Sequence, residues 1–218
     1  TSFVSHDRER HAQITQSGTS YDQVVRGIQI ALAEGFAVAA NMVLSKINFA
    51  DLRETAQFLH GLGVKNFCAT KMSPPLDTRD VRMLLLTRAE IKQSLATLKE
   101  LEGELGINID ILECYPLCLI GDGKRFAKFF RRRCVAGVSA CTVGSDGLVR
   151  PCSHASRGYG NILTESLSTI WKRMEDWRSG SYIPLVCKTC RHLPACTGGC
   201  RIDAFQARGG MNELDPCA

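Results

Sequence analysis

The spacing of the cysteines in the second half of the chain constrains the fold more than any other feature. Eight soft thiolates gathered in one segment are what two iron–sulfur clusters with four cysteine ligands each require. Such a segment indicates a protein that handles electrons or radicals, and it disfavours an ordinary hydrolase or scaffold. The pattern is Cys187-x2-Cys190-x5-Cys196-x3-Cys200, followed by Cys217 and preceded by Cys134, Cys141 and Cys152.

Structural zinc is the main alternative that the spacing leaves open. Cys187-x2-Cys190 has the spacing of one half of a zinc knuckle. Zinc sites usually pair two such tight halves, whereas here Cys196-x3-Cys200 follows closely and further cysteines remain unexplained. A disulfide framework is disfavoured because the eleven cysteines are an odd number and no secretory signal is present. Spacing alone therefore favours iron–sulfur clusters over zinc without deciding between them.

Composition limits the class of protein further. The 218 residues suit one or two domains, and 44% hydrophobic residues are enough for a core. A net charge of +5 permits an anionic partner but does not call for nucleic acid. No apolar run is long enough to span a bilayer. We therefore predict a cytoplasmic protein that binds neither nucleic acid nor a membrane.

The first half alternates helix and strand signals. Apolar residues recur with a helical period over 21–34, 51–60 and 88–105, and Thr87 with Glu90 forms a capping box in front of the last helix. Residues 36–44 form a nearly continuous apolar run, which predicts a strand buried on both faces. Further strands are expected over 64–70 and 107–112. This order predicts a parallel sheet with right-handed crossovers, about half of a (β/α) barrel.

The second half has a different character, with glycines, cysteines and turn signals and only short regular elements. The dipeptide Asp146-Gly147 predicts a tight turn between hairpin strands over 140–143 and 148–150. Apolar residues from Leu167 to Trp177 mark one amphipathic helix. We therefore predict two domains, residues 1–115 and residues 116–218.

The motifs of the second half, from about residue 115 to 218, resemble the SPASM domain. This is the C-terminal domain of a large group of radical S-adenosyl-L-methionine (SAM) enzymes, among them peptide, cofactor and sulfatase maturases. The first half is similar to the later part of the radical SAM barrel. The resemblance rests on Cys134-Val-Ala-Gly137, Ser145-Asp-Gly147-Leu-Val-Arg-Pro-Cys152, Tyr159-Gly-Asn161-Ile, and the core from Cys187 to Cys200.

The resemblance implies a fold, a set of ligands and a cofactor contact. The fold is α/β: the C-terminal part of a partial (β/α)6 radical SAM barrel, followed by a small cysteine-rich α+β SPASM domain. Two auxiliary 4Fe-4S clusters are implied. Ser2 lies where the family has a strand whose serine approaches the SAM ribose, so it is a candidate cofactor contact. The first cluster would use Cys134, Cys141, Cys152 and Cys200, and the second Cys187, Cys190, Cys196 and Cys217.

One departure from the family concerns the cluster that cleaves SAM. Radical SAM enzymes bind this third 4Fe-4S cluster with Cys-x3-Cys-x2-Cys near the start of the barrel, and the chain contains no such triplet. Cys114 and Cys118 have the first spacing only. We therefore expect the chain to be a fragment, inactive by itself, of a longer parent enzyme that holds SAM and the third cluster.

The implied parent is an oxidoreductase or maturase. It would modify a ribosomal peptide, a protein or a peptide-derived cofactor precursor by deoxyadenosyl-radical hydrogen abstraction, with flavodoxin or ferredoxin as the reducing partner. The auxiliary clusters would transfer electrons or bind substrate. Sulfatase maturation is disfavoured, because those maturases carry an acid just after the ligand equivalent to Cys152 and here the residue is Ser153. Alternative functions are a stand-alone iron–sulfur electron-transfer module and a zinc-stabilised binding domain.

Overall fold

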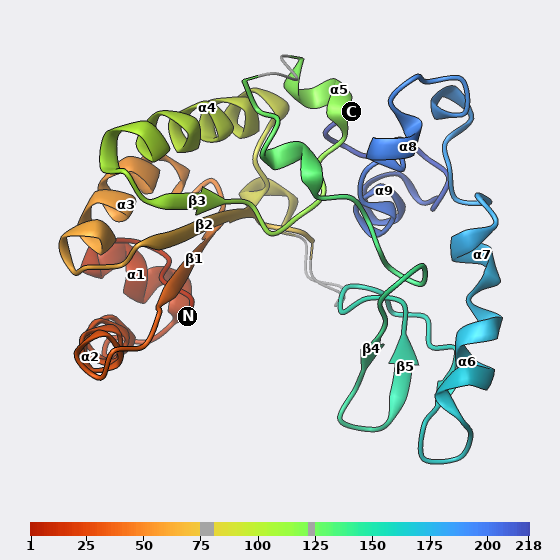
Figure 1. Cartoon of the computed structure of the whole chain (residues 1–218), viewed down its shortest axis with the longest axis horizontal. Coiled ribbons are helices and arrows are strands. Elements are labelled where there is room, and N and C mark those ends of the chain that lie inside the picture. Colours follow the sequence, from red (N-terminus) through yellow and green to blue (C-terminus); the bar gives the residue numbers. More distant parts are fainter. Residues whose placement is uncertain (75–80, 122–124) are drawn as a thin grey trace. The chain divides into compact units, whose positions relative to one another are not determined.

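The computed structural model describes residues 1–74, 81–121 and 125–218 (Figure 1). The described chain divides into two compact units. The first consists of residues 1–73, 81–113 and 125–129, and the second of residue 74, 114–121 and 130–218. The domain boundary at residues 115 and 116 stays a prediction.

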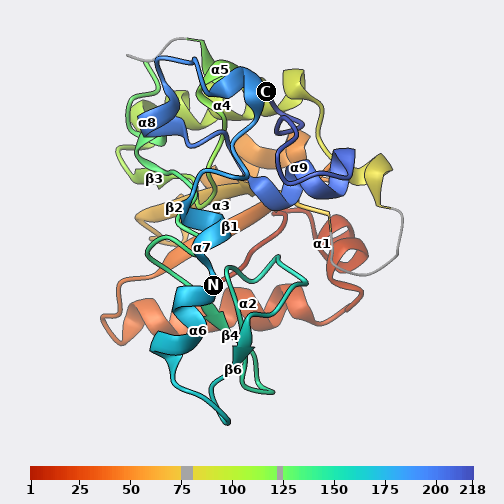
Figure 2. The same cartoon turned by 90° about the vertical axis from the view of Figure 1, so that its right-hand side faces the viewer.

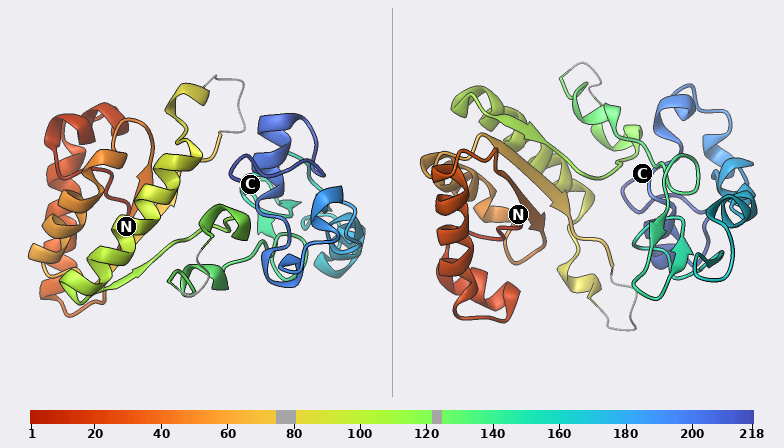
Figure 3. Two further views of the ribbon diagram at one scale, coloured as in Figure 1. Left: turned by 90° about the horizontal axis from the view of Figure 1, so that it is seen from above. Right: turned by 60° about the horizontal axis from the view of Figure 1, so that its bottom comes forward.

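A parallel three-stranded sheet, in the order β1-β2-β3, forms the centre of the first unit. The N-terminal residues extend this sheet, because Phe3 N–H donates to the Asn41 carbonyl at 2.9 Å and Asn41 N–H to the Thr1 carbonyl at 2.8 Å. The strands are β1 (Ala39–Leu44), β2 (Asn66–Lys71) and β3 (Asn108–Asp110), and the helices are α1 (Arg8–Thr15), α2 (Ser20–Ala33), α3 (Leu52–Gly61) and α4 (Arg88–Leu105). Figure 3 shows α3 and α4 running alongside the strands that they connect. The alternation of strands and helices confirms the predicted α/β class.

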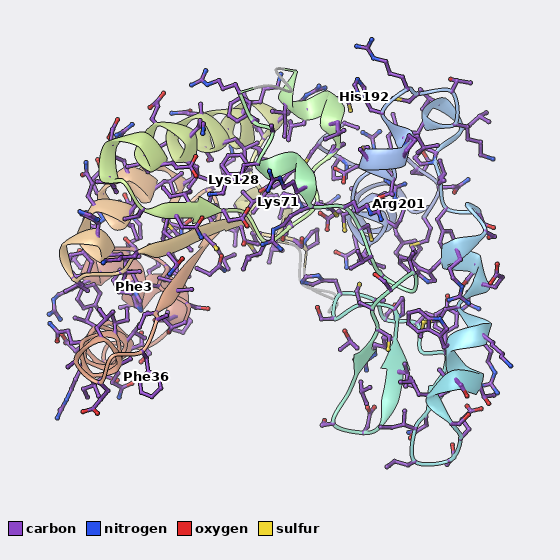
Figure 4. All side chains as sticks on the ribbon, in the orientation of Figure 1. Phe3, Phe36, Lys71, Lys128, His192 and Arg201 are labelled. Atoms are coloured by element: carbon purple, nitrogen blue, oxygen red, sulfur yellow. The ribbon has the colours of Figure 1, made fainter. Side chains whose placement is uncertain are left out.

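Only one face of the sheet is deeply buried. In β1, Ala40, Met42 and Leu44 are at most 2% exposed, and they belong to the same core as apolar residues of α3 and α4. The opposite face carries Asn41 and Thr70, whose side chains share a hydrogen bond of 2.8 Å. The prediction that residues 36–44 form a strand buried on both faces is therefore wrong. Within the described residues, α3 and α4 cover one face of the sheet. The strand is also shorter than predicted, because β1 begins at Ala39 and Phe36 is exposed (Figure 4).

The boundaries of α4 follow from local chemistry. The Thr87 hydroxyl accepts from Glu90 N–H at 3.3 Å, and the Glu90 carboxylate accepts from Thr87 N–H at 2.7 Å. This is the predicted capping box, and Gly106 ends the helix in the left-handed conformation. Lys46 also donates to both Glu90 oxygens at 2.6 Å. The hydrogen bonds from Lys46 and Thr87 lower the pKa of Glu90 to about 2.

Short elements around a small core form the second unit (Figure 2). An antiparallel sheet in the order β4-β5-β6 confirms the predicted hairpin across Asp146-Gly147. The predicted helix over 167–177 is present as α6 and α7. The elements are β4 (Thr142–Val143), β5 (Leu148–Arg150), β6 (Gly160–Asn161), α5 (Leu117–Ile120), α6 (Leu167–Arg173), α7 (Glu175–Arg178), α8 (Leu193–Cys196) and α9 (Arg201–Arg208). The described residues of both units also contain short 3₁₀ helices, at Phe49–Asp51, Arg82–Leu84, Phe129–Arg131 and Leu185–Cys187.

One apolar cluster of the second unit lies beside β5 and α6. Trp171 and Trp177 pack against this cluster, and so does Cys141. The cluster consists of Val149, Tyr159, Ile170 and Met174. Hydrogen bonds of Arg201 and Asp215 also hold the loops of this unit, close to several of the cysteines.

Candidate metal centre

Caps, turns and loops of the second unit position the cysteine side chains. Cys200 is the N-cap of α9, and its sulfur accepts from Asp203 N–H at 3.5 Å. Cys196 closes α8, and its sulfur accepts from Leu117 N–H at 3.4 Å. Cys152 follows the end of β5. The helix ends and the hydrogen bonds to the two sulfurs thus restrict the positions of Cys196 and Cys200.

A first group of thiols brings together residues that are far apart in the sequence. The Cys114 thiol hydrogen-bonds with the sulfurs of Cys134 and Cys200. Cys152 interacts electrostatically with both Cys200 and Cys134. The structure therefore brings together three of the four cysteines predicted for the first cluster, and it adds Cys114, which the sequence analysis did not assign as a ligand.

Hydrogen bonding and burial perturb the pKa values in this group. Donation from Cys114 lowers the pKa of the Cys134 thiol to about 7 and raises the pKa of Cys114 itself. Burial raises the pKa of Cys152 to about 11. Since thiolates bind iron, a thiol with a lowered pKa is prepared to act as a ligand, and the others must lose a proton as they bind.

Cys141, the fourth cysteine predicted for the first cluster, has different surroundings. It immediately precedes β4 and packs against the apolar cluster of the second unit. Its predicted role as an iron ligand stays a prediction.

A second group of thiols surrounds Cys187. This residue interacts electrostatically with Cys196, Cys118 and Cys190, and burial is the main cause of its raised pKa. Three of the four predicted ligands of the second cluster are thus brought together, with Cys118 as an addition. Cys217, the fourth, is 5% exposed, and its N–H donates to Asp215 at 2.8 Å.

A buried carboxylate connects the two predicted ligand sets. One oxygen of Asp215 accepts from Cys217 N–H, and the other accepts from Cys200 N–H at 2.7 Å. The preceding Gly199 has a φ of +85°, and a Cβ there would lie 2.5 Å from an Asp215 oxygen. Glycine is therefore required at position 199, because a larger residue would displace the carboxylate that holds both cysteine backbones.

A buried arginine next to Cys200 supplies positive charge to the same region. Arg201 (Figure 4) is 4% exposed, and its guanidinium donates to the carbonyls of Glu213 at 2.9 Å, Tyr182 at 3.2 Å and Met211 at 3.2 Å. It also donates to the carbonyls of Gly198 and Gly199. Its charge favours the thiolate forms of Cys134 and Cys187, one in each group. Sequence reasoning missed Arg201 and Asp215, although both lie within two residues of a predicted ligand.

The donor set fits a polynuclear centre. Across the described ranges 1–74, 81–121 and 125–218, no group of three or more His, Cys, Asp or Glu side chains is arranged to hold a metal ion. A four-iron cluster attaches its four thiolates to different irons, so it needs a wider set of sulfurs than a single ion. Two groups of thiols, each gathered from several loops, meet that requirement in number and chemical type.

Ser2, the candidate SAM contact, lies at the edge of the sheet in the first unit. It forms an isolated parallel bridge with Asn41 and is exposed. This placement agrees with a position at a strand, and the contact with SAM stays a prediction.

Comparison with known proteins agrees with the cysteine pattern. Residues 134–191 match the SPASM family, described as an iron–sulfur cluster-binding domain. PqqA peptide cyclase from Ruegeria pomeroyi is 24% identical over 234 residues, covering 94% of this chain and 59% of that protein. AdoMet-dependent heme synthase from Methanosarcina barkeri is 22% identical over 224 residues, covering 95% of this chain and 63% of that protein. The chain thus spans about three fifths of the length of these curated relatives.

Solved structures show the same fold. SuiB from Streptococcus suis bound to S-adenosylmethionine has a TM-score of 0.70 at 14% identity, covering 99% of this chain and 52% of that one. anSMEcpe with bound AdoMet has a TM-score of 0.72 at 17% identity, covering 99% of this chain and 62% of that one. Residues 134–191 thus match a SPASM domain, and the chain shares its fold with SuiB and anSMEcpe, in agreement with the grouping that its motifs predict. Nowhere in the described residues does a helix combine the length and apolarity needed to cross a membrane.

Proposed function

We propose that this chain contributes to a radical SAM/SPASM maturase that modifies a ribosomal peptide, a protein or a peptide-derived cofactor precursor. The observation that carries the proposal is the assembly of two groups of thiols around α8 and α9 from loops distant in sequence. Such groups serve iron–sulfur chemistry rather than hydrolysis. A reducing cytoplasm would keep these thiols available, and flavodoxin or ferredoxin would be the electron donor.

Similar proteins support a peptide as the substrate class. One curated relative is a peptide cyclase that acts on PqqA. SuiB has been solved bound to its precursor peptide SuiA, and anSMEcpe has been solved with the Kp18Cys peptide. The second relative is a heme synthase, which is why the proposal includes cofactor precursors.

Each predicted ligand set would hold one auxiliary 4Fe-4S cluster, and a bound cluster supplies a centre for one-electron transfer or a site that helps to hold substrate. The protein's own residues arrange the ligands. Asp215 fixes the backbones of Cys200 and Cys217, and Arg201 places a positive charge that favours thiolates in both sets. The family resemblance assigns Cys134, Cys141, Cys152 and Cys200 to the first set, and Cys187, Cys190, Cys196 and Cys217 to the second.

The first test is metal analysis. The protein is purified anaerobically and reconstituted, and iron, acid-labile sulfide and zinc are measured per chain. We expect about eight irons and about eight sulfides within this chain, with a brown chromophore. A Cys68→Ser variant is the matched control, since Cys68 lies in β2 outside both groups, and it should keep the full iron content. One or two zinc ions without sulfide would contradict the proposal and favour a zinc-stabilised binding domain.

The second test concerns the substrate class. The complete natural gene product is incubated with SAM, a reductant and candidate precursor peptides. We expect a peptide-dependent change in peptide mass and peptide-stimulated consumption of SAM. If the protein modifies heme precursors and no peptide, the peptide proposal is contradicted and a cofactor precursor becomes the favoured substrate class.

A further inference from the structure

The thiols around the start of α9 point to an iron ligand that the sequence motifs do not assign. We propose that Cys114, rather than Cys141, supplies the fourth thiolate of the set that contains Cys134, Cys152 and Cys200. This inference rests on the proposed iron–sulfur function and refines it. It concerns only which sulfur completes the first cluster.

The Cys114 sulfur lies in direct contact with two predicted ligands. It hydrogen-bonds with Cys134, from the loop before β4, and with Cys200, the N-cap of α9. Those two residues stand 20 and 86 positions further along the chain, so the contact is a product of the fold. Cys152 interacts electrostatically with the same two sulfurs, Cys134 and Cys200. Hydrogen bonds and electrostatic interactions therefore link four thiols from four separate segments, and four is the number that a cluster with only cysteine ligands requires.

The segment that follows Cys114 is held in place by buried side chains and hydrogen bonds. Tyr115, the next residue, is 5% exposed, and Leu119 in α5 is fully buried. Leu117 N–H donates to the Cys196 sulfur at 3.4 Å, and Leu119 N–H donates to the Pro116 carbonyl at 2.9 Å. Two buried side chains and the hydrogen bond from Leu117 to the Cys196 sulfur therefore restrict the segment next to Cys114.

Cys141 is engaged elsewhere. Together with Trp171 and Trp177, it packs against the apolar cluster of Val149, Tyr159, Ile170 and Met174, as a small hydrophobic side chain does at a core. To bind iron it would have to leave this apolar cluster. Cys141 also adjoins β4, where Thr142 pairs with Arg150 and Val143 with Val149, so its backbone is constrained by the hairpin.

Binding by Cys114 is an ordinary ligation step. Each thiol loses one proton to solvent as its sulfur bonds to an iron, and the iron and sulfide come from the reconstitution mixture. No change in the oxidation state of the protein is required. In the ligated state, the hydrogen bond from Cys114 to Cys134 is replaced by bonds from both sulfurs to iron.

A matched pair of variants tests the assignment. Cys114→Ser and Cys141→Ser are prepared with wild type, reconstituted anaerobically, and compared by iron content, EPR of the reduced protein and Mössbauer spectroscopy. We expect Cys114→Ser to lose about one to four irons per chain and to change the spectrum of one cluster, while Cys141→Ser matches wild type. Loss confined to Cys141→Ser, equal loss in both variants, or no loss in either overturns the assignment.

Thiol labelling keeps the test decisive if Cys114→Ser does not fold. Wild-type protein is alkylated before and after iron is removed with a chelator, and each cysteine is quantified by mass spectrometry. The assignment predicts that Cys114 is protected only while iron is bound and that labelling of Cys141 does not change. Protection of Cys141 alone would overturn the assignment. If wild-type protein binds no iron and sulfide, the proposed function itself is contradicted. If wild-type protein binds iron and sulfide normally but Cys114 is not protected from alkylation, only the role of Cys114 is contradicted.

Discussion

Arg201 offers the sharpest test of how the loops around the cysteines are held. Its guanidinium is 4% exposed and joins the segments at residues 182, 198–199 and 211–213 through their carbonyl oxygens. A hydrogen bond to a charged group contributes about 1.5–3 kcal/mol net. Because the five bonds of one side chain are not additive and water can enter after truncation, we expect Arg201→Ala to cost about 3–5 kcal/mol. That is a large part of the roughly 5–15 kcal/mol that stabilises a typical domain.

Arg178 provides the matched control. It also donates to backbone carbonyls, those of Gly137 at 2.7 Å and Trp171 at 2.8 Å, but its side chain is 21% exposed. Water can replace its bonds more easily, so Arg178→Ala should cost only about 1–2 kcal/mol. Arg201→Lys keeps the charge but has three donors on a single nitrogen, so its stability should fall between wild type and Arg201→Ala.

The assay uses the two tryptophans, Trp171 and Trp177, which both lie in the second unit. Their fluorescence therefore reports the unfolding of that unit alone during anaerobic urea titration of the iron-loaded protein. Equal losses for Arg201→Ala and Arg178→Ala would refute the reasoning, because burial of the cation would then make no difference. Unchanged stability in Arg201→Ala would refute it as well.

Three further predictions address single features of the two units. Ile170→Ala should destabilise the second unit by about 2–5 kcal/mol, since Ile170 is fully buried. Leu167→Ala, on the exposed side of α6, should change the stability by less than about 0.5 kcal/mol, and tryptophan fluorescence in urea measures both variants. Gly199→Ala should cost more than Gly209→Ala, because both glycines have positive φ but only a Cβ at 199 meets a neighbour, Asp215; equal unfolding midpoints would contradict this. Glu90 has a pKa of about 2 in the folded chain against 4.5 ordinarily, so its contribution to folding stability is complete above pH 4.5 and is lost as the pH falls toward 2. Glu90→Gln should therefore weaken the pH dependence of the unfolding free energy in this range, measured by circular dichroism.

Local sequence signals predicted most of the first unit. The capping box at Thr87 and the glycine at 106 fixed both ends of α4, because each acts through bonds to its own neighbours. The apolar run over 36–44 led to the wrong prediction of a strand buried on both faces. An apolar composition does not show which face of a strand is covered by another element. Coverage is a property of the assembled sheet, and within the described residues it differs between the two faces of β1.

At the candidate site, the sequence pattern anticipated part of each group of thiols, and the role of these thiols as iron ligands stays a prediction. Cys152 interacts with both Cys134 and Cys200, the grouping that the family resemblance implied, although 18 and 48 positions of the sequence separate these residues. The contact of Cys114 with this group is a long-range one, and its only sequence signal was the Cys-x3-Cys spacing beside Tyr115-Pro116. Asp215 and Arg201 gave no motif signal, since one carboxylate or guanidinium near a cysteine is common in any sequence.

The second unit has too little apolar burial to order its loops by hydrophobic packing alone. Its described strands are two or three residues long, and a small apolar cluster around Ile170 is part of its core. Small domains of this kind depend on additional links such as metal ligation. Arg201 and Asp215 hold the backbone around the thiols, but they leave the sulfurs to be joined by iron. Folding of the second unit and loading of its thiols should therefore be thermodynamically coupled, so that removing iron lowers the stability of this unit while the first unit is unaffected.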